Sequence, residues 1–226
     1  MLLFLKMPHV RSLHIMPCCY HKLALSDARG KASFVHFPLS AALKGALEAG
    51  AGAVNVHFNR PFLRLACQQT SARWRHTSAL EHAIHGRQMF LRALAEGLRA
   101  ENELLVRRKS KGRLTEALNF EDVQESYQLR LEETAAPLSW QSKHEQHFQE
   151  IMARFANGQG PRLAEALTCL QTAMQKLCEN VVLFDRLCYL EEAAVAQGLS
   201  VRARYEQLLD EKLSPRCFVL VAEKLT

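Results

Sequence analysis

The sequence predicts a mixed α/β fold in which a long, mostly helical segment separates one early strand from two late ones. Three observations carry this prediction. An apolar and β-branched run, 10–16, lies near the start, and two strand-like runs, 200–209 and 216–223, lie at the end. Between them, caps and apolar residues recur at helical spacing. We therefore expect a single domain over 1–226 with a mostly helical insert at 62–198.

The first strand is expected to be buried, because the apolar residues of 10–16 do not strictly alternate with polar ones. It ends at Pro17, and residues 18–22 are expected to form the turn that leaves its carboxyl end. Ser40 is a candidate cap for a short helix over 41–49. The Gly-Ala-Gly run at 50–52 is expected to end that helix rather than to bind a nucleotide, because a helix and not a strand precedes it.

Five helices are predicted in the insert. They span about 62–75, 79–106, 119–131, 139–157 (with Ser139 or Ser142 at the start) and 161–197.

Helix signals in the insert are local and specific. Ser78 with Glu81 three residues later forms a capping-box pattern, and Asn119 is a candidate cap. Pro161 suits the first turn of the last helix, which could also be broken near Asn180. Gly198 is a good left-handed terminator for that helix.

Composition places the chain among ordinary globular proteins. Hydrophobic residues make up 48% and charged residues 23% of 226 residues, and the formal net charge of +6 permits an anionic partner such as RNA without requiring one. Seven cysteines, an odd number without framework spacing, indicate free thiols and a reducing compartment, so cytoplasm or nucleus is expected. The apolar run 2–5 is too short for a signal peptide, and no run is long enough for a membrane span, so no membrane partner is expected.

Five short segments carry a resemblance to a known family. They are 15–23 (IMPCCYHKL), 37–40 (FPLS), 64–67 (RLAC), 182–191 (VLFDRLCYLE) and 213–216 (LSPR). In this order and rough spacing, they resemble the methyltransferase-like protein twenty-five family, which includes the ribosomal RNA adenine dimethylase domain-containing protein. The resemblance covers nearly the whole chain after Val10.

The resemblance implies a Rossmann-type methyltransferase that uses S-adenosyl-L-methionine and acts on RNA. The Cys-Cys-Tyr segment would follow the fourth strand of a seven-stranded sheet, and the terminal hairpin would supply the last two strands, the final one antiparallel. Such folds bind ligands beyond the carboxyl ends of their strands. By resemblance, Pro17, Cys18, Cys19 and Tyr20 would then line the acceptor side of the pocket, with His21 beside them.

The sequence also departs from the family pattern. These enzymes hold the cofactor with a glycine-rich turn after the first strand and an acidic residue after the second, and neither precedes the Cys-Cys-Tyr segment here. We therefore expect an incomplete, carboxy-terminal part of the sheet that contains no cofactor-binding residues. The chain alone is expected not to bind S-adenosyl-L-methionine and to be inactive.

The residues of the Cys-Cys-Tyr segment allow several chemistries. A metal site is not expected, because adjacent cysteines seldom share one ion and no second pair is suitably spaced. Cys18 or Cys19 could be a nucleophile with His21 as its base, but no third group orients the pair. Cys18 and Cys19 could instead be buried thiols beside a turn. We favour an acceptor site in which the ring of Tyr20 stacks on an unpaired base.

Other candidate residues lie in the insert. The basic loop 107–113, with Arg107, Arg108 and Lys109, could contact RNA phosphates or be merely solvated. His82 and His85 share a helix face, which we expect to be solvated rather than metal-binding. Aromatic and leucine residues at helical spacing are expected in the core, as are two cysteines: Phe120, Phe148, Phe155, Phe184, Leu187, Leu190, Cys178 and Cys188.

Two functions remain open on the sequence alone. The first is the acceptor-side portion of an RNA methyltransferase, and the alternative is a non-catalytic helical module that binds protein or RNA. Binding of S-adenosyl-L-methionine separates them. In either case the first strand would lack a neighbour on one edge, and such an apolar edge favours aggregation.

Overall fold

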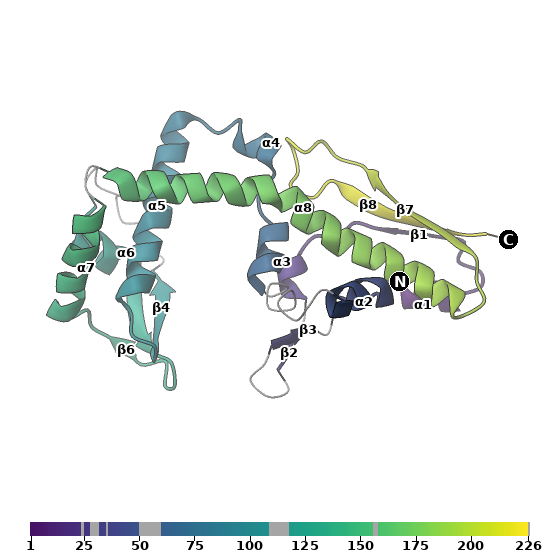
Figure 1. Cartoon of the computed structure of the whole chain (residues 1–226), viewed down its shortest axis with the longest axis horizontal. Helices are drawn as coiled ribbons and strands as arrows, with labels where there is room; N and C mark the ends of the chain where they lie inside the picture. Colours follow the sequence, from purple (N-terminus) through teal and green to yellow (C-terminus); the bar gives the residue numbers. More distant parts are fainter. Residues whose placement is uncertain are drawn as a thin grey trace. The chain divides into compact units, whose positions relative to one another are not determined.

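The computed structural model describes residues 1–23, 25–27, 32–34, 36–49, 60–108, 118–155 and 158–225. The chain forms two compact units (Figure 1). The first contains Met1–His76 and Cys169–Thr226, and the second contains Thr77–Thr168. The predicted mixed α/β class is therefore confirmed. The second unit is shorter than the predicted insert, because the last helix of that insert contributes most of its length to the first unit.

A three-stranded sheet organises the first unit. Its strands are β1 (Ser12–Ile15), β8 (Phe218–Lys224) and β7 (Val201–Gln207), in the order β1-β8-β7. β8 is antiparallel to both neighbours, with Ser12 opposite Glu223 and Val201 opposite Lys224. The three predicted strands and the antiparallel final strand are thus confirmed. Only the central β8 is buried along most of its length, whereas β1 is an edge strand that alternates between exposed and half-buried residues, so its expected burial is wrong.

Short helices and one helix of 37 residues accompany this sheet. They are α1 (Leu2–Lys6), a 3-10 turn η1 (Tyr20–Lys22), α2 (Ala41–Ala49), α3 (Arg60–Ala66), α4 (Ser71–Trp74) and the carboxyl part of α8 (Gln159–Val195). A small hairpin of β2 (Leu25–Asp27) and β3 (Ala32–Phe34) was not predicted.

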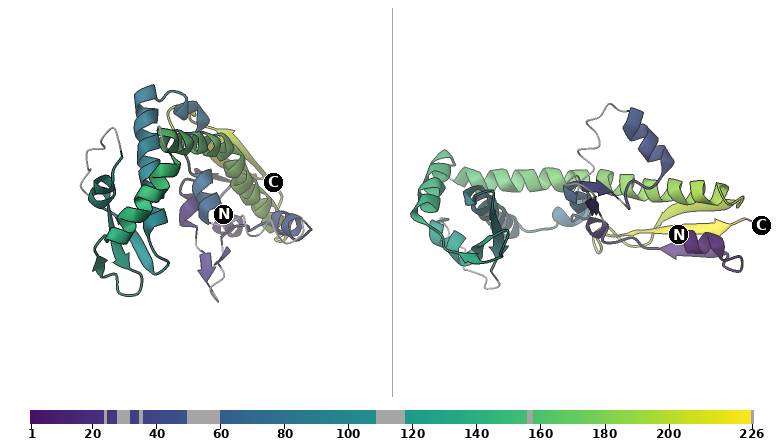
Figure 2. Two further views of the ribbon diagram at one scale, coloured as in Figure 1. Left: turned by 60° about the vertical axis from the view of Figure 1, so that its left-hand side comes forward. Right: turned by 90° about the horizontal axis from the view of Figure 1, so that it is seen from below.

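Helix α8 packs on the sheet through small and branched side chains. Leu190 and Ala194 contact Leu220 and Ala222 of β8, and both views of Figure 2 place the carboxyl part of α8 beside the strands. The break considered near Asn180 is absent, because α8 is continuous, and Gly198 has the left-handed φ of 66° expected of a terminator. By contrast, the helix predicted over 62–75 is two helices, α3 and α4, with Thr70 capping the second.

The second unit combines helices with a sheet that the sequence analysis missed. Its helices are α5 (Ala79–Leu98), α6 (Phe120–Ser126), α7 (Ser142–Arg154) and the start of α8, and its strands are β4 (Glu103–Arg107), β5 (Tyr127–Leu131) and β6 (Pro137–Leu138). The strands form an antiparallel sheet in the order β4-β5-β6. Both predicted capping residues are confirmed. The side chains of Ser78 and Asn119 each accept from the backbone N–H three residues on, and their own backbone N–H groups donate to the side chains of Glu81 and Asp122.

Two predicted helices end early because their last residues pair as strands. The helix expected to reach Val106 ends at Leu98, where Glu103 accepts a hydrogen bond from the Ala100 backbone and turns the chain into β4. The helix expected to reach Leu131 ends at Ser126, and Tyr127 and Leu129 then alternate inward on β5. The helical spacing of apolar residues continues from each helix into the strand that follows it. Periodicity alone therefore did not show where the helix ends and the strand begins.

Candidate functional site

The Cys-Cys-Tyr segment leaves the carboxyl end of β1 as an extended turn. Pro17, Cys18 and Cys19 lie outside any helix, and Tyr20 begins the 3-10 turn η1. Lys22 donates its backbone hydrogen bond to the Cys19 carbonyl at 2.9 Å, which closes the turn. The predicted position of this turn, directly after a strand that pairs with β8, is therefore confirmed.

Both cysteines of the turn are exposed. Their Sγ atoms lie 3.2 Å apart, and the hydrogen bond with Cys19 raises the pKa of the Cys18 thiol above its ordinary value. A raised pKa leaves little thiolate at neutral pH, and thiolate is the reactive form. The interpretation of these residues as buried thiols is wrong, and nucleophilic activity is not favoured at Cys18.

His21 contacts Cys67 rather than acting as a partner of the two cysteines in the turn. Its Nδ1 lies 3.5 Å from the Sγ of Cys67, the residue that follows α3. The Arg60 side chain donates a hydrogen bond to the His21 carbonyl at 2.9 Å. Cys67 in turn reaches the Cys18 carbonyl at 3.7 Å. Burial raises the pKa of the Cys67 thiol. His21 is thus part of the contact between the turn and α3, and the alternative in which it acts as a base for Cys18 or Cys19 gains no support from these contacts.

Tyr20 lies beneath the turn and is 4% exposed. Its hydroxyl donates to Glu179 Oε1 of α8 at 3.1 Å, and the Arg216 guanidinium lies 5.6 Å from the centre of its ring. Burial, and then the Glu179 carboxylate, raise the pKa of Tyr20 well above its usual range. The ring is therefore covered in this structure, which corrects its interpretation as a stacking surface for an acceptor base. Tyr20 instead anchors the turn to the core.

Arg216 and Glu179 form the centre of this buried cluster. Arg216 Nη1 lies 2.5 Å from Glu179 Oε1 and also donates to the Ala66 carbonyl at 2.9 Å, while Nη2 donates to the Gln68 carbonyl at 2.7 Å. Gln175 donates to Glu179 Oε2 at 2.8 Å. A buried ion pair needs further hydrogen bonds to offset its loss of hydration. Here Arg216 donates to two backbone carbonyls, and Glu179 accepts from Tyr20 and Gln175.

A second buried carboxylate connects two of the segments that carry the family resemblance. Asp185 of α8 accepts from the backbone of Leu39 and Ser40 and from the Ser40 hydroxyl, at 2.8–3.0 Å. Ser40 in turn caps α2 through the Leu43 backbone at 3.2 Å, as predicted. Glu192 accepts from Ala41 and Ala42 in the same turn. Helix α8 thus holds the start of α2.

The predicted RNA-contacting cations lie in the second unit rather than in the first. Arg107 ends β4 opposite Tyr127, and Arg108 donates through Nε to the Tyr127 carbonyl at 3.3 Å. Lys109, like the Gly-Ala-Gly run at 50–52, lies outside the described residues.

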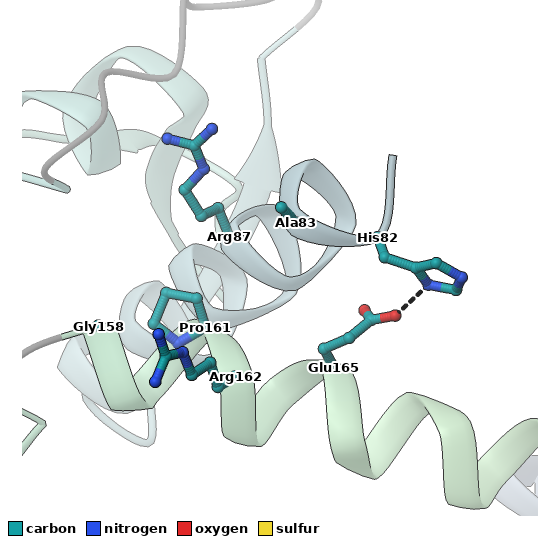
Figure 3. A pocket seen from close by; sticks show the side chains of 7 residues that line it. All are labelled: His82, Ala83, Arg87, Gly158, Pro161, Arg162 and Glu165. Carbon is teal, nitrogen blue, oxygen red and sulfur yellow. Dashed lines mark hydrogen bonds and ion pairs between the residues drawn. The ribbon is translucent and has the colours of Figure 1, made fainter. Parts of the chain in front are cut away.

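The second unit has a pocket of its own between α5 and α8. It encloses about 390 Å³ and is lined in part by His82, Arg87, Pro161 and Arg162 (Figure 3). Glu165 points toward His82, with 2.5 Å between Oε1 and Nδ1, and its Oε2 lies 3.0 Å from His85 Nδ1. The histidine face is therefore paired with a carboxylate, not simply solvated as expected. Across the described ranges, no group of three His, Cys, Asp or Glu side chains could hold a metal ion.

S-adenosyl-L-methionine finds no fitting site among the described residues. A Rossmann-type site needs a strand followed by a glycine-rich turn and a helix whose amino end faces the ligand. Here β1 is followed by Pro17 and two cysteines, and β7 is connected to the antiparallel β8 without a helix. The described part of the chain therefore does not fit this cofactor.

Comparisons with protein-family models, with curated proteins and with solved structures found no match. Within the described part of the chain, no helix has both the length and the apolar character that a bilayer crossing requires.

Sequence reasoning missed the residues that support the turn. Glu179 and Asp185 are charged residues inside the apolar stretch 177–190, and Arg216 lies two residues before a buried strand. Charges in such positions are rarely buried unless they are paired. This signal was available, but the identity of the partners depends on contacts between segments from 37 to 159 residues apart in the chain.

Proposed function

We propose that the first unit is the acceptor-binding portion of an S-adenosyl-L-methionine-dependent methyltransferase that acts on RNA, and that this portion lacks the cofactor-binding half. The observation that carries the proposal is the convergence of the family-like segments. Tyr20, Ala66 and Arg216 come from three of these segments, yet they meet around Glu179 of α8 in one buried cluster beneath Cys18 and Cys19.

The strand order also supports the proposal. The resemblance implies a final strand that is antiparallel to its neighbours, and β8 runs antiparallel between β1 and β7. Ligands in α/β sheets bind beyond the carboxyl ends of parallel strands, and the Cys-Cys-Tyr turn leaves the carboxyl end of β1. The exposed Cys18 and Cys19 then form the surface that faces the acceptor, and the buried Tyr20 positions them.

Protection from alkylation tests this proposal. N-ethylmaleimide is reacted with the purified chain, with and without a short adenine-rich single-stranded RNA, and labelling is followed by mass spectrometry. We expect RNA to slow the labelling of Cys18 and Cys19. The labelling rate of the exposed Cys169, which lies on α8 and outside the turn, should stay unchanged. Equal labelling of Cys18 and Cys19 with and without RNA would remove the turn from the acceptor site.

The burial of Tyr20 favours a second candidate, a non-catalytic interaction module, because the aromatic ring that would stack on a base is covered. Calorimetry with S-adenosyl-L-methionine separates the two candidates at the level of the whole chain. Saturable binding at micromolar ligand would support the methyltransferase and contradict the expectation that this chain does not bind the cofactor. Absence of binding, together with unprotected cysteines, would leave the interaction module as the better candidate.

A further inference from the structure

The outward face of α8 in the first unit carries a regular apolar stripe. Leu170 is 63% exposed, Met174 50%, Leu177 64% and Phe184 58%. Phe184 was predicted to lie in the core, and its exposure corrects that prediction. Val181 completes the spacing and is half-buried. A run of large apolar side chains along one exposed helix face is unusual for a monomer and marks an interaction surface.

The opposite face of the same helix is already packed against the first unit, so the stripe is not a core-facing surface turned outward by mistake. Thr172, Gln175, Glu179 and Asp185 point inward and are at most 4% exposed. The last three have hydrogen-bond partners from other segments of the first unit. Cys178, Val182 and Leu183 of the same helix are also buried. Helix α8 therefore has a packed and hydrogen-bonded inner face in addition to the exposed apolar stripe.

The spacing of the stripe is that of a coiled coil. The apolar positions 170, 174, 177, 181 and 184 alternate by four and three residues, an average of 3.5. This average, rather than 3.6, keeps an apolar seam facing a second helix. Leu163 and Leu167 continue the same spacing toward the start of α8 in the sequence.

The residues that flank the stripe are compatible with an identical surface on a second chain. The exposed flanking residues Gln171, Ala173 and Asn180 are uncharged, so they would not repel an identical surface although the chain has a net charge of +6. The nearby Lys176 is paired with Glu211 at 2.5 Å, which offsets its charge. An apolar seam with 3.5-residue spacing packs against a second helix that has a seam of the same spacing. A second copy of this chain carries such a seam.

We propose that the apolar stripe of α8, Leu170 to Phe184, forms a two-helix coiled-coil seam with the same stripe of a second copy of the chain. The contact is isologous, so each copy contributes the same surface. This inference depends on neither candidate function, because it requires no cofactor and no RNA.

Sedimentation equilibrium of the full chain over a range of concentrations tests the proposal. We expect the wild type to have the mass of two chains. Leu177→Glu places a charge in the seam and should raise the dimer dissociation constant about tenfold or more. Leu213→Glu is the matched control, because Leu213 is 81% exposed in the same unit but lies outside α8. It should leave the dimer unchanged.

A wild type that remains a single chain at all concentrations would overturn the proposal and leave a different protein as the occupant. A dimer that survives Leu177→Glu would also overturn it. Far-ultraviolet circular dichroism checks that the variant keeps its helices. If Leu177→Glu does not fold, Leu177→Gln replaces it, because a neutral polar side chain also weakens the seam. A weakened dimer would then support the proposal, and an unchanged dimer would overturn it.

Discussion

Glu179 of α8 and Arg216, which lies two residues before β8, form a buried ion pair with 2.5 Å between Oε1 and Nη1. The same carboxylate oxygen accepts from Tyr20. One carboxylate therefore connects the long helix, the entry to the central strand and the Cys-Cys-Tyr turn.

Removal of the Glu179 carboxylate should strongly destabilise the first unit. Glu179→Ala leaves the Arg216 guanidinium buried without its counter-charge, and breaking a buried pair in this way costs about 3–5 kcal/mol. Urea denaturation followed by circular dichroism measures the loss. Glu211→Ala is the control, because it removes the more exposed Lys176–Glu211 pair and should cost about 1 kcal/mol or less. Equal losses in the two variants would contradict the central role of Glu179.

The start of α2 should depend on the hydroxyl of Ser40. Ser40→Ala removes both the bond to Asp185 and the cap on the Leu43 backbone, and loss of such a cap costs about 0.5–2 kcal/mol. Ser40→Thr keeps an acceptor and a donor and should retain more of the stability. The measurement is again the midpoint of urea unfolding, and a midpoint for Ser40→Ala equal to that of the wild type would exclude this role.

Acid should weaken the second unit through His144. This side chain is buried, its Nδ1 accepts from the Gln141 backbone at 2.9 Å, and its Nε2 has no partner among the described residues. Burial lowers the pKa of His144 below its ordinary value of 6.5. The unfolded chain then binds the proton more tightly, so stability falls as the pH drops below about 6.5.

Melting temperatures at pH 7.5 and pH 5.5 measure this effect. His144→Gln keeps an acceptor for the Gln141 backbone without titrating, so it should reduce the loss of stability in acid. His147→Gln changes an exposed histidine of the same helix and should keep the acid sensitivity of the wild type. If the two variants respond alike to acid, His144 is not the group responsible.

Two glycines of α5 should respond in opposite directions to alanine. A Cβ on Gly86 would lie 2.7 Å from the Pro161 carbonyl oxygen of α8, so the two helices would have to separate. Overpacking of this kind costs about 1–3 kcal/mol. A Cβ on Gly97 would meet only the Ile151 side chain, at 3.8 Å. Gly97→Ala should therefore stabilise the helix by up to about 1 kcal/mol.

Thermal unfolding of Gly86→Ala and Gly97→Ala, measured side by side, checks the signs. Gly86 lies in the interior of α5 and Gly97 in its last turn, so the intrinsic preference for alanine is at least as large at Gly86 and cannot account for a loss of stability there. A Gly86→Ala variant more stable than the wild type would mean that α5 and α8 do not approach closely at this point.

Local signals predicted the starts of the helices well and their carboxyl ends poorly. The caps at Ser40, Ser78 and Asn119 were recognised because each depends on a side chain and a backbone group three residues apart. Strands β4 and β5 were read as continuations of helices, because a short apolar run fits either period. Their pairing decided the outcome: Leu105 lies opposite Leu129 only when both segments are extended.

The sequence by itself determined the α/β class, the three strands of the first unit, the position of the Cys-Cys-Tyr turn and most of the helix caps. Each of these follows from residues close together in the chain. Only the tertiary structure decided that Tyr20 is buried and Phe184 exposed, although both are aromatic residues in apolar surroundings in the sequence. Burial depends on which face of α8 turns inward, and on that face Gln175, Glu179 and Asp185 find hydrogen-bond partners from distant segments of the chain.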